Sequence, residues 1–551
     1  MQTTTETSAS PESKPGMQKP QTMQYPQERS FYDGLLREGR DAPTRAEIES
    51  VLAHTGLTTD DPRLATLRGV LKPYAMSDAV PFDALLPALR GDGGTLLRRA
   101  LRGDLTIPDF DLFTSTLKKI FDDVTGIRTG EVASYIPQLA RVDADAFAMA
   151  VCTLDGQQFS LGDDATPYCV QSTCKPINYA IALDLLDAEK VHRHVGREPS
   201  GRSFNEITLN SAGLPHNPMI NAGAIMCASL IEPQNSSADR FDRIIKTWRA
   251  MAGDRPVGFD NAVFLSERDT ADRNFSLAYF MRENGAFPPD TNLQSTLDLY
   301  FQCCSITVDV RQMAVIAASL ANGGVCPLTS ERVFTSGTVK NCLSLMASCG
   351  MYDFSGEYAF TVGLPAKSGV SGALFITIPG VCGIALWSPR LDALGNSVRG
   401  VEFSRQLTRA FNFHTFSDMV SDSGLSNPRR PRAEISADEA TYLCAAAAAG
   451  DIDELRRLLA RGIDINRADY DGRTALHLAA SEGRAETIAY LLERGADAVK
   501  LDRWGNTPLD DAERGMHHDI VARLKAAAGR PFRATATARS LKPVLAKAGP
   551  K

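Results

Sequence analysis

Ser172 and Lys175 are the residues whose types and spacing most clearly suggest chemistry, because they form an S-x-x-K motif followed directly by Pro176. Positions i and i+3 share one face of a helix, so the lysine amine can reach the serine hydroxyl. Proline suits the first turn of a helix, which places Ser172 at the helix start, where the dipole favours a developing alkoxide. A partly buried lysine has a lowered pKa and can act as the base. The motif therefore predicts a serine nucleophile activated by Lys175.

Two later segments favour this catalytic interpretation over a chance serine–lysine pair on a solvated helix face. Lys367-Ser368-Gly369 precedes an apolar strand, as the K-[ST]-G strand does beside the active site of penicillin-recognising serine enzymes. Its alternative interpretation is a glycine-rich strand entry with a surface lysine. Tyr352 lies on a loop bounded by glycines, and a tyrosine there can relay protons, although it could also be a half-buried packing residue.

Six ordered motifs are distributed along the chain. They are Ser134–Ala140, Gln171–Pro176, His216–Ile225, Ser266–Phe275, Cys349–Gly356 and Leu364–Gly372. With these motifs, the stretch from about residue 31 to about residue 416 resembles the glutaminase family. The helical start of the chain and its C-terminal repeats are also similar to the arrangement of the animal kidney-type and liver-type enzymes. The resemblance implies an α+β catalytic domain with a fold like that of serine β-lactamases and penicillin-binding proteins. The implied reaction is hydrolysis of L-glutamine to L-glutamate and ammonia through a serine acyl-enzyme.

Residue roles follow from the resemblance at the matching positions. Ser172 would be the nucleophile and Lys175 its base, while Tyr352 would carry a proton to the leaving ammonia and back from water. The backbone N–H groups of Ser172 and Val370 would form the oxyanion hole. No cofactor and no metal are implied. The implied substrate contacts are Tyr135, Ser172, Asn221, Glu267, Asn274, Tyr300, Tyr352 and Val370.

The chemistry of glutamine agrees with these side chains. Glu267 suits the α-ammonium group, whereas asparagine and tyrosine donors suit the α-carboxylate without adding charge. Each residue taken alone has a plainer interpretation. Asn221 or Asn274 could cap a helix or a turn, and Glu267 could be a surface carboxylate.

The overall composition argues against several functional classes. The chain has 551 residues and a net charge of -7, which gives no sign of nucleic-acid binding. It has no run of about 18 apolar residues, so we expect no membrane span. Its 11 cysteines lack metal-type spacing and indicate reduced thiols. Residues 1–29 resemble neither a secretory signal nor an arginine-rich transit peptide, so we predict a disordered leader and a cytoplasmic protein.

The chain divides into segments by its sequence patterns. Residues 30–125 predict an all-α, EF-hand-like domain, a small four-helix unit without the ligand spacing of a calcium loop. Residues 126–420 mix strands and helices and predict an α+β domain on an antiparallel sheet. Within it we expect a hairpin at Asp155-Gly156 and two buried strands between Gly372 and Trp387. Residues 421–435 read as a linker and residues 529–551 as a basic tail.

Residues 436–528 repeat with the ankyrin period. Leu443, Leu476 and Leu509 are 33 residues apart, and the segments that start at Thr474 and Thr507 match the ankyrin signature T-P-L-H-x-A. Each repeat is a helix pair that buries its apolar face only by stacking on its neighbours. The period and the motif together predict an ankyrin module, which could recruit a protein partner.

We therefore expect a glutaminase that binds L-glutamine. We also expect it to assemble as a homo-oligomer, either a dimer or a homotetramer. Neither nucleic acid nor a membrane is an expected partner. A penicillin-binding-type serine hydrolase is the first alternative, but the chain has no S-D-N element after the S-x-x-K motif. A non-enzymatic ankyrin scaffold is the second, and it would have no need to keep Ser172, Lys175 and Tyr352 together.

Overall fold

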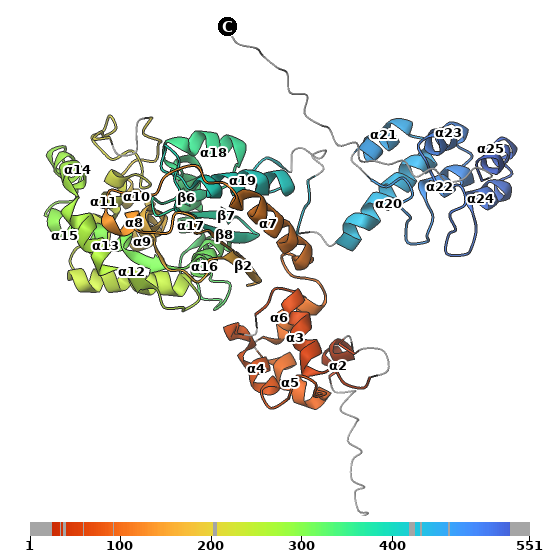
Figure 1. Ribbon diagram of the computed structural model, residues 1–551, viewed down its shortest axis with the longest axis horizontal. Coiled ribbons are helices and arrows are strands. Elements are labelled where there is room, and N and C mark those ends of the chain that lie inside the picture. The colour runs from red at the N-terminus through yellow and green to blue at the C-terminus, as the bar shows by residue number, and fades with distance from the viewer. Residues whose placement is uncertain are drawn as a thin grey trace, which may run out of the picture. The chain divides into compact units, whose positions relative to one another are not determined.

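The computed structural model in Figure 1 describes residues 25–33, 35–36, 40–58, 60–91, 93–201, 206–417, 425–429, 432–460 and 463–528. Most of the predicted leader, much of the predicted linker and the whole of the predicted basic tail lie outside these residues. The chain separates into two compact units, residues 1–405 and 406–551. No helix in the part of the chain that the structure describes is both long enough and apolar enough to cross a bilayer.

A five-stranded antiparallel sheet with the order β2-β1-β8-β7-β6 lies at the centre of the first unit. β1 and β2 pair across the Asp155-Gly156 turn, and β7 and β8 pair across the turn at Pro379 and Gly380. The predicted hairpin and the two predicted buried strands are therefore confirmed. The side chains of β1, β7 and β8 are buried along their whole length, which explains their unbroken apolar sequences. The strands are β1 (Ala148–Thr153), β2 (Gln158–Gly162), β6 (Ala366–Ser368), β7 (Ala373–Ile378) and β8 (Cys382–Trp387).

Helices pack against both faces of this sheet. α16 (Val310–Ala321) lies against β1, β7 and β8. Figure 1 shows this helix beside β8. Gly383 allows this close approach, because a Cβ atom there would lie 2.2 Å from the backbone nitrogen of Ala318. On the opposite face, a Cβ atom at Gly400 in α19 (Val398–Ala410) would lie 3.1 Å from Leu374 of β7. The two helices therefore hold β7 in place from both faces, next to β6, which carries Lys367.

A largely helical region is inserted between β2 and β6. It surrounds a small antiparallel sheet with the order β3-β5-β4, in which β3 is Tyr168–Cys169, β4 is Gly258–Phe259 and β5 is Ile306–Val308. Helix α8 (Pro137–Ala140) precedes β1. The remaining helices of the inserted region are η2 (Gln171–Cys174), α9 (Lys175–Leu186), α10 (Ala188–Val191), α11 (Asn221–Leu230), α12 (Ser237–Met251), α13 (Asn261–Asp269), α14 (Asp272–Glu283), α15 (Leu293–Cys304), α17 (Ser336–Cys349), η3 (Tyr352–Phe354) and α18 (Ser355–Thr361).

The N-terminal part of this unit is helical, as predicted, but it is built from more helices than the four expected. Short helices such as α4 span too few turns for their periodicity to stand out in the sequence. Asp61 caps the 3-10 turn η1 by accepting from the backbone N–H of Arg63, which starts a helix that the sequence pattern does not reveal. The helices are α2 (Pro26–Asp33), α3 (Arg45–His54), η1 (Pro62–Leu64), α4 (Ala65–Leu71), α5 (Phe82–Arg90), α6 (Gly94–Leu101) and α7 (Phe110–Thr125).

The β1–β2 turn joins the N-terminal helices to the sheet through buried polar contacts. The Asp155 carboxylate accepts a hydrogen bond from Arg99 at 2.6 Å. Gln157 is fully buried, and its amide nitrogen donates to the carbonyl oxygens of Thr55 at 2.8 Å and Ile107 at 2.9 Å. The Gln157 amide oxygen accepts from the backbone N–H of Ile107 at 3.3 Å. One hairpin turn thus satisfies backbone groups that the helices leave unpaired.

The second unit contains stacked helix pairs, which agrees with the predicted repeat. α22 and α24 begin 33 residues apart, at Ala475 and Pro508. The histidine of the signature has a structural role, because the Nδ1 atom of buried His477 accepts from the backbone N–H of Thr474 at 3.1 Å. The helices are α20 (Arg432–Ala449), α21 (Ile452–Ala460), α22 (Ala475–Ser481), α23 (Ala485–Glu493), α24 (Pro508–Arg514) and α25 (His518–Ala528).

We predict that Gln157→Leu destabilises the first unit. The leucine cannot pair with the backbone groups of Thr55 and Ile107, and each buried group left unpaired costs about 1–3 kcal/mol. The midpoint of urea unfolding, followed by circular dichroism, should fall clearly. Gln294→Leu on exposed α15 surface is the control and should leave the midpoint unchanged. An unaltered midpoint in Gln157→Leu would show that this turn does not support the helical part.

Candidate active site

Ser172 and Lys175 meet where the 3-10 turn η2 passes into helix α9. Lys175 is the first residue of α9 and Pro176 follows it in the first turn, as the sequence predicts. The Nζ atom of Lys175 donates a short hydrogen bond to the Oγ atom of Ser172. Lys175 is buried, and this burial lowers the pKa of its amine. A buried amine in contact with a half-buried hydroxyl is the arrangement that a serine nucleophile activated by a lysine would need.

Two backbone positions next to the serine have a conformation that is uncommon for residues other than glycine. The φ angle of Gln171 is 47° and that of Tyr352 is 53°. The Tyr352 turn is held by Ser355, whose hydroxyl donates to the carbonyl oxygen of Tyr352 at 2.7 Å and accepts from the N–H of Met351 at 3.0 Å. Strain of this kind persists where the surrounding structure fixes it, and it is concentrated at functional sites.

Tyr352 lies between the Ser172 hydroxyl and a second buried lysine. Its hydroxyl interacts with Ser172, and the pKa of Tyr352 is raised by burial. The Nζ atom of Lys367 lies 4.4 Å from the centre of the Tyr352 ring and donates to the carbonyl oxygens of Gly350 at 3.1 Å and Ser368 at 2.8 Å. Burial holds the pKa of Lys367 well below its usual range, and nearby Lys175 lowers it further. This places Lys367 in the site and not on the surface.

Glu267 belongs to a cluster of three polar side chains on one side of Ser172. The Tyr135 hydroxyl donates to Glu267 at 2.5 Å, and the Gln171 amide nitrogen donates to the same carboxylate oxygen at 3.0 Å. Burial raises the pKa of Glu267, while these two hydrogen bonds and Lys175 oppose that rise. About half of the Tyr135 side chain is exposed, although its hydroxyl points inward to the carboxylate. The carboxylate is thus fixed in position and has hydrogen-bonding capacity left for a cation.

Asn221, Asn274 and Tyr300 form the second polar cluster. The Tyr300 hydroxyl donates to the Asn221 amide oxygen at 3.2 Å, and the Asn221 amide nitrogen donates to the Asn274 amide oxygen at 3.2 Å. The Nζ atom of Lys175 lies 5.6 Å from the centre of the Tyr300 ring, which connects this cluster to the Ser172–Lys175 pair. Asn221 begins α11 and Asn274 lies in the first turn of α14, so helix starts deliver both amides.

Val370 lies in the turn between β6 and β7, directly after a glycine that approaches Ser172. A Cβ atom at Gly369 would lie 3.0 Å from the carbonyl oxygen of Val170 and 3.5 Å from the backbone nitrogen of Ser172. Glycine therefore lets the two chain segments touch. The segment that carries Val370 is thus close to the backbone of Ser172, and an oxyanion hole would need two such N–H groups side by side.

The structure brings all of the residues proposed from the sequence into one site. It adds Gln171 and Lys367, which are not among the site residues predicted from the sequence. Gln171 directly precedes Ser172 in the motif Gln171–Pro176, and Lys367 lies in the Lys367-Ser368-Gly369 segment, so position in a motif was the available signal. Tyr352 also borders a pocket of about 530 Å³ lined by Asn217, Ser348 and Asp353. Across the described residues, no group of His, Cys, Asp or Glu side chains is placed to hold a metal ion.

Comparison with known proteins finds the same family from sequence and from structure. The family model described as glutaminase matches residues 130–416, and a model for ankyrin repeats matches residues 426–502 and 443–530. The chain is 42% identical over 450 residues to the protein named "Glutaminase liver isoform, mitochondrial" of Rattus norvegicus, covering 81% of this chain and 74% of that protein. It is 41% identical over 321 residues to a glutaminase of Nostoc sp., covering 57% of this chain and 95% of that protein.

Two solved structures resemble the catalytic part. The structure named "Probable glutaminase ybaS" is 34% identical, with a TM-score of 0.52, and the match covers 55% of this chain and 97% of that one. The crystal structure of Mglu is 38% identical, also with a TM-score of 0.52, and the match covers 54% of this chain and 75% of that one. The α+β fold of serine β-lactamase type expected from the sequence is thus confirmed, as is the ankyrin module.

We predict that the buried Lys367 makes stability depend on pH. Its pKa is lower in the folded chain than the ordinary 10.5, so the unfolded chain binds more protons over the range between the two values. The free energy of unfolding should therefore rise with pH over that range as the pH approaches 10.5, and Lys367→Met should reduce that slope. Urea titrations at several pH values measure it, with the exposed Lys340→Met as the control. Equal slopes in Lys367→Met and the wild type would contradict the assigned environment.

Proposed function

The chain belongs to the glutaminase family, and on that premise we propose that Ser172 is the nucleophile with which it hydrolyses L-glutamine to L-glutamate and ammonia. The observation that carries this proposal is the hydrogen bond from the buried Lys175 amine to the Ser172 hydroxyl. A lysine with a lowered pKa is neutral for more of the time near neutral pH, and only the neutral amine can accept the serine proton.

The first half of the reaction forms the acyl-enzyme. Lys175 takes the hydroxyl proton of Ser172 as the oxygen attacks the side-chain carbonyl carbon of glutamine. The resulting oxyanion lies against the backbone N–H groups of Ser172 and Val370. Tyr352 then donates its proton to the amide nitrogen, the carbon–nitrogen bond breaks and ammonia leaves. The proton held by Lys175 returns to the Tyr352 oxygen, so the enzyme regains its starting charge.

The second half of the reaction consumes water. A water molecule gives a proton to the Tyr352–Lys175 pair and attacks the acyl carbon. The ester bond to Ser172 breaks, its oxygen regains a proton from the same pair, and glutamate leaves. The raised pKa of Tyr352 suits this exchange, because a phenol buried beside the serine keeps its proton until the leaving group needs it.

The two polar clusters would recognise the amino-acid end of glutamine. Glu267 carries the charge that an α-ammonium group needs, and Tyr135 and Gln171 hold that carboxylate in place. Asn221, Asn274 and Tyr300 supply neutral donors for the α-carboxylate. This division gives the site a preference for a substrate with both charged groups on its α-carbon.

The alternatives raised by the sequence are less well supported. A penicillin-binding-type hydrolase would share the fold, but the family match and the relatives are glutaminases. A scaffold that had lost catalysis would not be expected to keep the Ser172–Lys175 bond and two ordered polar clusters. We further propose a homo-oligomer and a protein partner for the ankyrin module. The cytoplasmic location stays a prediction, since the name of the rat relative places that protein in mitochondria.

We predict that Ser172→Ala abolishes glutamine hydrolysis without unfolding the chain, because the variant loses the attacking oxygen. The diazoketone 6-diazo-5-oxo-L-norleucine, a reactive analogue of glutamine, alkylates a nucleophile with loss of dinitrogen. It should therefore add its mass, less that of the dinitrogen, once to the wild type and to Ser344→Ala, which changes an exposed serine on α17. It should not add to Ser172→Ala. Peptide mass spectrometry that placed the adduct on another residue would refute the assignment.

We predict that Glu267→Gln weakens substrate binding by removing the charge that faces the α-ammonium group. A hydrogen bond to a charged group contributes about 1.5–3 kcal/mol, so KM should rise about 10- to 100-fold. Steady-state kinetics with an ammonia readout measures this, and Glu283→Gln on the exposed side of α14 should match the wild type. A KM that stays at the wild-type value would place the ammonium elsewhere.

A further inference from the structure

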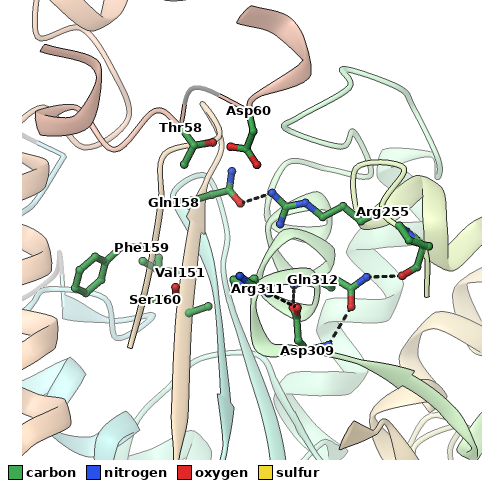
Figure 2. Close-up of a pocket in the computed structure, with 12 residues that line it drawn as sticks. Thr58, Asp60, Val151, Gln158, Phe159, Ser160, Arg255, Asp309, Arg311 and Gln312 are labelled. Carbon is green, nitrogen blue, oxygen red and sulfur yellow. Dashed lines mark hydrogen bonds and ion pairs between the residues drawn. The ribbon is translucent and has the colours of Figure 1, made fainter. Parts of the chain in front are cut away.

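A second pocket lies away from the catalytic residues, where the N-terminal helices meet the edge of the large sheet. Its volume is about 590 Å³, which is within the usual range for small-molecule sites. Thr58 and Asp60 contribute from the segment between α3 and η1, and Gln158 contributes from β2 (Figure 2). Arg255 contributes from the segment between α12 and β4. Figure 2 shows these four side chains grouped at one end of the pocket.

Two buried polar atoms in this end of the pocket lack hydrogen-bond partners. They are the hydroxyl oxygen of Thr58 and the amide nitrogen of Gln158. Figure 2 shows the Gln158 nitrogen directed toward the side of the pocket where Thr58 and Asp60 lie. Because an unpaired buried polar atom is costly, such atoms call for an explanation. A bound polar molecule would supply the missing acceptor and donor.

The same end of the pocket holds one unpaired charge of each sign. Among the residues that the structure describes, Asp60 forms no ion pair, and the guanidinium of Arg255 has only the neutral Gln158 amide oxygen, at 3.2 Å. The other charged pair of the pocket is already occupied. Arg311 pairs with Asp309 at 2.9 Å, and Asp309 also accepts from the backbone N–H of Gln312 at 2.8 Å as the cap of α16.

We propose that this pocket binds the zwitterionic end of a free α-amino acid. The ligand carboxylate would accept from Arg255 and from the unpaired Gln158 nitrogen, as guanidinium and amide donors favour. The ligand ammonium would donate to Asp60 and to the unpaired Thr58 oxygen. One α-carbon carries both charges next to each other, so a single small molecule satisfies all four groups.

A simple anion or a simple cation would satisfy only half of these groups. Phosphate or a carboxylate without an ammonium group would leave Asp60 unpaired and close to a second negative charge. An amine without a carboxylate would leave Arg255 and the Gln158 nitrogen without an acceptor. The zwitterion is therefore the ligand class that the charges of this site favour over either alternative.

The position of the pocket gives its ligand a way to act on the fold. Thr58 and Asp60 belong to the N-terminal helical part, whereas Gln158 and Arg255 belong to the catalytic part. One backbone hydrogen bond already joins the two parts beside the pocket, from the N–H of Gln158 to the carbonyl oxygen of Gly56 at 2.8 Å. An amino acid bound at this point adds contacts across the same junction, so it should tighten the junction.

The test is a binding measurement on the full chain after its catalytic serine has been blocked with 6-diazo-5-oxo-L-norleucine. L-glutamine is the probe, because its side chain is neutral and the blocked enzyme cannot consume it. Calorimetry should show one molecule bound per chain. Glutaramate, which lacks the ammonium group, and 4-aminobutanamide, which lacks the carboxylate, should each bind at least about tenfold more weakly. Inorganic phosphate is the competing simple anion.

Asp60→Asn and Arg255→Gln should each weaken L-glutamine binding about 10- to 100-fold in the blocked protein. Asp242→Asn and Arg249→Gln, two exposed positions on α12 outside the pocket, are the matched controls and should bind like the wild type. Urea unfolding midpoints that match the wild type show that the variants remain folded.

Three outcomes would overturn the proposal. The first is no saturable glutamine binding to the blocked protein, as expected of a pocket that holds only water. The second is phosphate or glutaramate binding as tightly as glutamine and unaffected by Asp60→Asn, which would make this an anion site. The third is equal binding by the pocket variants and the controls. Failure to form the covalent adduct would instead concern the role of Ser172, which separates the two proposals.

Discussion

The buried amine of Lys175 is the constraint on which the active site depends. A charged ammonium is costly away from water, and the hydrogen bond that the structure describes for this amine goes to the neutral hydroxyl of Ser172. Burial therefore lowers the pKa of the Lys175 amine. Lys367 is buried nearby, and burial together with the charge of Lys175 holds its pKa well below its usual range. The Glu267 carboxylate acts on the Lys175 amine through its charge. It accepts hydrogen bonds from Tyr135 and Gln171, which fix its position.

The rest of the fold holds the groups of this region in place. Buried strands β7 and β8 pack against helix α16, and glycines at 383 and 369 let neighbouring backbones approach to contact distance. Gln171, directly before Ser172 in the chain, and Tyr352, whose hydroxyl interacts with Ser172, have positive φ angles of 47° and 53°. Packing and turn geometry thereby set the positions of the side chains around Ser172.

Local sequence features predicted a large part of this structure. The spacing of Ser172, Lys175 and Pro176 fixed the helix start, and alternating or unbroken apolar runs located the two hairpins, because those effects act over a few residues. Resemblance to a family supplied the distant members of the site, such as Asn221 and Glu267. The short helix α4 was missed because one or two turns carry little periodicity. The pocket at Asp60 and Arg255 could not be foreseen, since its members are almost 200 residues apart and become neighbours only through the fold.

The β1–β2 turn has a consequence for how such a protein can evolve. The Gln157 amide nitrogen donates to the backbone of Thr55 and Ile107, while its amide oxygen also accepts from the Thr153 hydroxyl of the hairpin at 3.1 Å. A chain without the N-terminal helices would leave this amide nitrogen and the Asp155 carboxylate without the partners that they have here. Such a chain should therefore tolerate substitution at these two turn positions more readily than on the buried strand before them.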